Sequence, residues 1–141
     1  MRELTGPCRY AADMLSACET VSFATENEDG CPRVCIVTPV KVDGYATIFF
    51  STSIGSEKVR QLTQNPKSSV CYQVGRDSQT LTGTARVLTD PALKKELWRD
   101  WMLRHFPLGP DDPDYCIVRF TGQRATLWYE GNFITFDITE G

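Results

Sequence analysis

A chain of 141 residues is long enough to bury one hydrophobic core but too short for a catalytic domain plus a cofactor domain, so any large ligand is expected in a cleft or between subunits. Hydrophobic residues make up 41% of the chain and charged residues 23%, which is typical of a globular protein and excludes a disordered or membrane-embedded one. The 15 Lys and Arg against 18 Asp and Glu give a net charge of -3, and no basic run marks a nucleic-acid surface.

Charged residues interrupt the first 19 positions, which breaks up any signal-peptide core, and no run approaches the roughly 18 apolar residues of a spanning helix. We therefore expect a cytoplasmic protein without a membrane partner. The six cysteines include no Cys-x-x-Cys pair, the spacing typical of a zinc site or a dithiol, and no metal site is predicted. On a regular strand Cys31 and Cys35 lie about 13 Å apart, too far for a disulfide. Reduced thiols that are buried or half-buried are the simpler interpretation, and a redox-sensitive or substrate-facing thiol is the alternative.

In chain order, the sequence first predicts a helix over 7–19, which begins at a proline and has apolar residues near helical spacing. This helix is expected to act as a lid or an edge cover. A strand follows over 20–25, and the polar turn after it ends in Gly30, which predicts a hairpin.

A second hairpin is predicted by the valine- and isoleucine-rich segment 33–42, the tight turn Asp43-Gly44 and the β-rich segment 45–51. A short helix is expected over 57–64, since its apolar residues lie on one side, and Asn65-Pro66 closes it.

Strands are predicted over 68–74 and 80–88, and apolar and polar residues alternate in the second, as expected when one face is buried. Asp90 is expected to cap a longer helix with Pro91 at its first position and a wide apolar face that reaches Met102. Three final strands are predicted after a proline-rich loop, over 116–120, 124–129 and 133–138. Short turns between successive strands favour a mainly antiparallel sheet, and a barrel resolves its edges, so one mainly β domain with a few flanking helices is expected over 1–141.

The segment from Ser51 to Lys58 carries the clearest chemical signal. It gathers hydroxyls, a glycine and a lysine between a strand end and a helix start. A helix N-terminus presents free amide groups and the positive end of the helix dipole, which suits a phosphate. The alternatives are that Ser56 is only an N-cap and that Lys58 is only a solvated charge.

Other candidate residues give weaker evidence of function. The only histidine, His105, excludes multi-histidine metal sites and makes no case for acid–base catalysis by itself. A packing or capping role at a helix end is the simpler interpretation. Trp98 and Trp101 are interpreted as core or dimer packing, with flavin stacking as the alternative. The acidic segment 111–114 is expected to be a solvated turn rather than a metal site. No dinucleotide fingerprint, phosphate loop or nucleophile elbow is present.

Read in order, several segments resemble the pyridoxamine 5'-phosphate oxidase-like FMN-binding split barrels, particularly the general-stress-protein branch. The segments that carry the resemblance are 30–34, 48–60, 65–70, 81–87, 106–115 and Leu127-Trp128. The resemblance implies an antiparallel split β-barrel and a homodimer that binds FMN between its two subunits.

The resemblance also implies which residues contact the cofactor. Thr52, Ser56 and Lys58 match positions that hold the FMN phosphate and ribityl chain, and the strand near Val34 matches the one beside the isoalloxazine. Gln79 and Trp128 would come from the partner subunit. The full implied set is Arg33, Val34, Cys35, Ile36, Ser51, Thr52, Ser56, Lys58, Gln79 and Trp128.

Two positions depart from the pattern, because Glu57 and Cys35 stand where many relatives have arginine. Losing two cations near a dianion weakens binding, since each charge-assisted hydrogen bond contributes about 1.5–3 kcal/mol. Arg33 or Arg60 is the candidate replacement. No arginine follows Arg124, so the substrate segment of the vitamin oxidases is not matched.

Three functions follow from these observations. The first is an FMN-dependent reductase or oxidase of an unknown small molecule, in which the cofactor supplies the redox chemistry. The second is a non-catalytic module that binds flavin or haem for storage or sensing. The third is a structural dimer whose ligand site has decayed.

Overall fold

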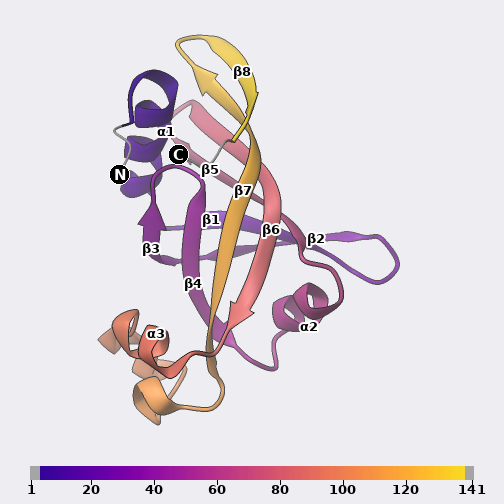
Figure 1. Cartoon of the computed structure of the whole chain (residues 1–141), viewed down its shortest axis with the longest axis vertical. Helices are drawn as coiled ribbons and strands as arrows, with labels where there is room; N and C mark the ends of the chain where they lie inside the picture. Colours follow the sequence, from indigo (N-terminus) through magenta and orange to yellow (C-terminus); the bar gives the residue numbers. More distant parts are fainter. Residues whose placement is uncertain (1–3, 139–141) are drawn as a thin grey trace.

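The computed structural model describes residues 4–138 (Figure 1). Its helices are α1 (Gly6–Ala17), α2 (Glu57–Gln64) and α3 (Pro91–Glu96), with 3₁₀ helices η1 (Asp100–Arg104) and η2 (Gly109–Asp111). Its strands are β1 (Val21–Glu26), β2 (Pro32–Val37), β3 (Pro39–Asp43), β4 (Thr47–Ser53), β5 (Lys67–Val74), β6 (Asp77–Leu88), β7 (Tyr115–Tyr129) and β8 (Asn132–Asp137). No helix in this part of the chain is long and apolar enough to cross a membrane.

The strands form one antiparallel sheet in the order β2-β1-β5-β6-β7-β4-β3, and β8 pairs with β7. Strands β2 and β3 lie at the two edges of this order, yet only Thr38 separates them in the chain. The sheet must therefore curl until its edges meet, as Figure 1 shows. This confirms the expected antiparallel, barrel-like sheet.

Both predicted hairpins are confirmed, and their glycines show why the turns lie where they do. Gly30 has φ +84° and ends the turn between β1 and β2, while Gly44 has φ +63° in the turn between β3 and β4. Positive φ is a conformation that glycine adopts without a steric penalty.

Two hydrophobic clusters fill the molecule. The larger lies inside the curl, where Phe23 packs edge-to-face against Phe50 and Phe120, with ring centroids 4.9 and 6.4 Å apart. Helix α1 covers it, as expected of a lid, with Leu15 buried. The smaller cluster lies where α3 and η1 cover β4 and β7. Its buried members are Phe49, Leu97, Met102, Phe106, Tyr115 and Ile117.

The predicted long helix after Asp90 is wrong in its length. Asp90 does cap α3 by accepting a hydrogen bond from the Leu93 amide at 3.0 Å, and Pro91 begins the helix. Helix α3 nevertheless ends at Glu96, and Arg99 adopts an extended conformation before η1 begins. The Arg99 guanidinium donates to the Val40 carbonyl at 2.9 Å, a contact with β3 that holds the break in place.

Two other boundaries also differ. The segment predicted as one strand over 33–42 divides at Thr38 into β2 and β3, and two of the three final strands merge into β7. The merged strand continues past Gly122, which lies opposite Gly83 at a shift of the β6–β7 register. A Cβ on Gly83 would lie 2.1 Å from the Thr121 carbonyl oxygen, so only glycine permits this approach.

Candidate functional site

The turn between β4 and α2 is held by contacts with the start of β7. The Ile54 amide donates to the Asp114 carbonyl at 2.7 Å, and the Ser53 hydroxyl donates to the Asp114 carboxylate at 2.6 Å. The amide of Gly55 donates back to the Ser53 hydroxyl at 3.3 Å. These bonds fix the direction in which the chain enters α2.

The first turn of α2 has the features expected of an anion-binding helix start. Ser56 caps the helix, because its hydroxyl oxygen accepts from the Val59 amide at 3.4 Å, and the Thr52 hydroxyl donates to the same oxygen at 3.3 Å. The amides of Glu57 and Lys58 belong to the helix start and have no intrahelical acceptor. Ser56 is therefore an N-cap, as one interpretation predicted, and the neighbouring amides stay available to a ligand.

Polar contacts hold α2 against the hairpin of β1 and β2. Gln61, 2% exposed, accepts from the Thr25 hydroxyl and donates to the Asn27 side chain. Arg60 pairs with Glu28 and, at 2.5 Å, with Glu57. The helix start therefore has a fixed place relative to β2.

The end of β4, the start of α2 and the end of β2 line one hollow of about 540 Å³. Two other hollows, lined mainly by other parts of the sheet, have about 470 and 460 Å³. Four of the predicted site residues line it: Ile36, Ser51, Thr52 and Lys58. Lys58 makes no ion pair with any residue between 4 and 138.

The other predicted residues of β2 do not line this hollow. Arg33 is half-buried, and its Nη1 atom is buried without a hydrogen-bond partner in the described structure. Val34 is 65% exposed on the outer face of the sheet, and Cys35 packs against the larger cluster. The orphaned guanidinium nitrogen of Arg33 is a group for which an anionic ligand would supply an acceptor.

Gln79 and Trp128 are not brought to the hollow of the same chain. Gln79 is fully buried and donates its amide to the Tyr72 hydroxyl and, at 3.2 Å, to the Tyr45 carbonyl. Trp128 packs on Phe133 across the β7–β8 hairpin, with ring centroids 4.6 Å apart. That hairpin lies at the end of the molecule opposite α3 (Figure 1). A role for either residue toward the partner's flavin stays a prediction.

Two groups near the turn have shifted pKa values. The hydrogen bond and charge of Arg60, aided by Arg33, lower the pKa of Glu57, which therefore stays ionised. Burial raises the pKa of Cys116 to about 11, and its thiol donates to the Thr52 carbonyl at 3.3 Å. Cys116 is therefore a neutral support for the turn. All six cysteines are free thiols, but Cys31 and Cys71 are exposed rather than buried or half-buried, which corrects the expectation for these two.

The far wall of the hollow was missed by the sequence reasoning. It is formed by Trp101 and Arg104 of η1 and by the two residues that follow it, His105 and Phe106. Trp98 packs in the smaller cluster against Tyr115, as expected, whereas Trp101 is 45% exposed. Both tryptophans follow the same helical spacing, so the sequence held no signal to separate them.

The acidic loop 111–114 is not simply solvated. Asp112 is buried and accepts from the amides of Leu108 and Asp114, at 3.2 and 2.9 Å, while its carbonyl accepts from the buried Lys94 ammonium at 3.1 Å. No group of three or more metal-ligating side chains occurs among the described residues. The loop therefore supports the turn at Ser53 through Asp114.

Comparison with known proteins identifies the class. The family model described as "Pyridoxamine 5'-phosphate oxidase like" matches residues 9–139, nearly the whole chain. The chain therefore belongs to the pyridoxamine 5'-phosphate oxidase-like family. No curated protein sequence matches it.

Solved structures agree on the fold and on the branch. A Clostridium acetobutylicum protein related to general stress protein 26 of Bacillus subtilis is 29% identical, with a TM-score of 0.81 and 92% of each chain covered. A heme binding protein from Mycobacterium smegmatis is 17% identical, with a TM-score of 0.75, 96% of this chain covered and 60% of that one. A pyridoxamine 5'-phosphate oxidase-related, FMN binding protein from Nostoc punctiforme is 15% identical, with a TM-score of 0.69 and coverages of 93% and 94%. The expected split barrel is confirmed.

Proposed function

We propose that this protein binds FMN, with the phosphate at the start of α2. The observation that carries the proposal is the meeting of Thr52, Ser51 and Lys58 in one hollow beside the capped helix start. Two free helix amides, the hydroxyls and one ammonium group form a donor set suited to a phosphate. The FMN-binding neighbour supports the choice of cofactor.

Arg33 is proposed as the cation that replaces the arginines missing at positions 35 and 57. Arg60 is already paired with two carboxylates, whereas a guanidinium nitrogen of Arg33 has no acceptor. The charge of Glu57 repels a phosphate, but its pairing with Arg60 offsets that repulsion. The two departures from the family pattern therefore weaken the phosphate site without abolishing it.

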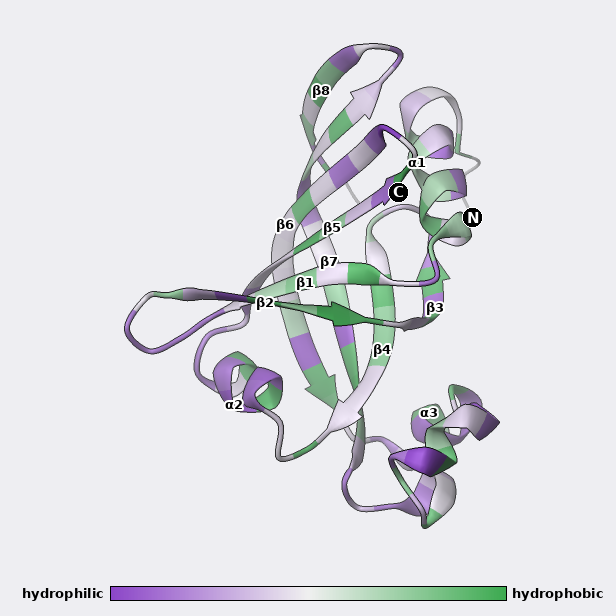
Figure 2. Ribbon diagram, turned by 180° about the vertical axis from the view of Figure 1, so that it is seen from behind, coloured by the Kyte–Doolittle hydropathy of each residue, from purple (hydrophilic) through white to green (hydrophobic). Residues whose placement is uncertain are grey.

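We also propose a homodimer with the flavin at its interface. Val34 and Ile36 are 65% and 64% exposed on β2, and the end of this strand is coloured hydrophobic in Figure 2. Ile36 lines the hollow as well, so the apolar face and the hollow are continuous. A second copy that covers this face would close the hollow and could bring Trp128 to it, since β7 and β8 end far from the hollow of their own chain.

The proposed activity is that of a cytoplasmic reductase or oxidase of a small molecule. Bound FMN would supply the electron-transfer chemistry, and this chain would orient the cofactor and exclude water. The alternative is a binding or sensing module for flavin or haem. The heme binding neighbour and the position of His105, the only histidine, at the hollow favour that alternative for haem.

Titration of the ligand-free protein with FMN tests the proposal. We expect quenching of flavin fluorescence that saturates at one FMN per chain. The Lys58→Ala variant should bind FMN at least about tenfold more weakly, which is the effect of losing one charge-assisted hydrogen bond. Lys67→Ala is the matched control, because Lys67 is an exposed cation outside the hollow. If excess FMN gives no quenching and added haem gives a Soret band, the ligand of this protein is haem and not flavin.

A further inference from the structure

The far wall of the hollow packs against the smaller cluster on one side and exposes polar side chains to the hollow on the other. Met102 and Phe106 are 0% and 4% exposed in the smaller cluster, which fixes η1 against β4 and β7. In a 3₁₀ helix, residues three apart lie above one another, so Trp101 and Arg104 share the face toward the hollow. The His105 ring follows, 6.5 Å from the Trp101 ring between centroids.

The charges of the hollow are unbalanced. Lys58 comes from one wall and Arg104 from the other, and neither pairs with an acid within the described part of the chain. The one carboxylate in the lining, Asp114, accepts the Ser53 hydroxyl at 2.6 Å and balances only one of these two positive charges. By contrast, Arg60 and Arg124 each have a carboxylate partner. Two unpaired cations that face one hollow attract an anion and repel each other without it.

We propose that Arg104 and His105 bind an oxyanion, a phosphate or a carboxylate, on the wall of the hollow opposite Lys58. The inference rests on the proposed function in placing the flavin in this hollow. The oxyanion comes from one of two sources. It is either the FMN phosphate, which the start of α2 would hold from one side and Arg104 from across the hollow, or the acidic group of a second small molecule beside the flavin. The exposed face of Trp101 supplies apolar surface next to Arg104, which suits an anion carried on a planar or apolar body.

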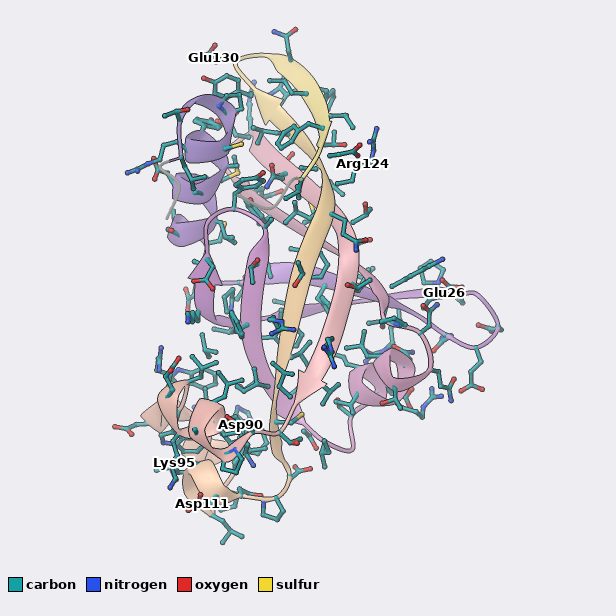
Figure 3. All side chains as sticks on the ribbon, in the orientation of Figure 1. Glu26, Asp90, Lys95, Asp111, Arg124 and Glu130 are labelled. Carbon is teal, nitrogen blue, oxygen red and sulfur yellow. The ribbon has the colours of Figure 1, made fainter. Side chains whose placement is uncertain are left out.

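The first experiment needs no flavin. His105 is the only histidine, so its ring nitrogens give one set of signals in a ¹H–¹⁵N spectrum of the ¹⁵N-labelled protein. We expect inorganic phosphate to shift these signals saturably, and Arg104→Gln to weaken this binding by about tenfold. The matched control is Lys95→Gln, which removes an exposed cation of α3 that does not line the hollow (Figure 3). Absence of a saturable shift in the unaltered protein would overturn the proposal.

The second experiment identifies the source of the oxyanion by titration with FMN and with riboflavin. If the anion is the FMN phosphate, Arg104→Gln weakens FMN binding by about tenfold and leaves riboflavin binding unchanged. If the anion belongs to a second molecule, Arg104→Gln leaves FMN binding unchanged. Inorganic phosphate then still shifts the His105 signals of the FMN-loaded protein, but it does not shift those of the FMN-loaded Arg104→Gln variant. An Arg104→Gln variant that matches the unaltered protein in every titration would refute both. If phosphate shifts His105 but FMN does not bind, the proposed function fails and this anion site remains.

Discussion

The two ends of the molecule differ in whether their polar side chains find partners within the chain. At the α1 end, the buried Tyr72 hydroxyl donates to the Tyr45 carbonyl at 2.9 Å and accepts from the buried Gln79 amide nitrogen, so both of these donors have partners within the chain. At the α3 end, Lys58 and Arg104 face a hollow without acidic partners among the described residues. Groups matched within the chain stabilise the fold, whereas groups left unmatched beside a hollow are available to a ligand. Substitutions at the first end should lower stability, and those at the second should lower binding.

The largest expected effect comes from Gly83→Ala, which should disrupt both ends together. Strands β6 and β7 connect the two ends, and the new Cβ would lie 2.1 Å from the Thr121 carbonyl and 2.9 Å from the Gly122 Cα. Backbone atoms cannot move aside cheaply, so we expect the free energy of unfolding to fall by about 3 kcal/mol or more. Urea denaturation followed by circular dichroism measures it.

Gly55→Ala is the control for this substitution, because its nearest neighbour would be the Ser53 hydroxyl at 4.0 Å and its φ is not positive. Its stability should stay within about 0.5 kcal/mol of the unaltered protein. A Gly83→Ala variant that is as stable as the unaltered protein would contradict the close approach of β6 and β7.

The next largest effect is expected from Tyr72→Phe. Gln79 would lose a partner inside the fold, where its Oε1 atom already has none in the described structure. A buried polar group without its hydrogen bond costs about 1–3 kcal/mol, so the urea midpoint should fall while the FMN affinity stays unchanged. Thr80→Val, which removes an exposed hydroxyl, should change neither quantity. A loss of FMN affinity in Tyr72→Phe would show that the two ends are not separate.

The smallest effect concerns alkaline pH and is absent near neutrality. Burial raises the pKa of Tyr45 and of Tyr115 to about 12, against about 10 in an unfolded chain. Between these values the folded protein keeps protons that the unfolded chain has lost. The Cys116 thiol, whose pKa burial raises from about 9 to about 11, adds the same effect from about pH 9. The free energy of unfolding should therefore begin to fall near pH 9 and fall further as the pH rises toward 12. Urea midpoints that rise over this interval would contradict the burial of these two hydroxyls.

Local signals predicted much of the fold. Gly30 and Gly44 gave the two hairpins, and the helix over 57–64 was predicted with its observed bounds. The break after Glu96 carries no local signal, and the contact seen beside it joins Arg99 to a carbonyl 59 residues away in the chain. The apolar pattern continues through the break, so the spacing alone favours one long helix.

The candidate site also has one part that the sequence predicts and one part that it does not. The turn from Ser51 to Lys58 was predicted because it is one continuous segment with hydroxyls, a glycine and a lysine at a helix start. The wall that carries Arg104 and His105 comes from a segment more than 40 residues further along the chain, and only the curl of the sheet brings it to the hollow. Neighbours that tertiary structure alone brings together leave no local pattern in a single sequence.

The account rests on a phosphate at the start of α2, and the ratio of the affinities for FMN and riboflavin tests this claim most directly. The two ligands differ only in the phosphate, so fluorescence titration of the ligand-free protein compares that group alone. We predict that FMN binds at least about tenfold more tightly, and that Lys58→Ala removes most of the difference. Equal affinities for the two flavins would contradict the account.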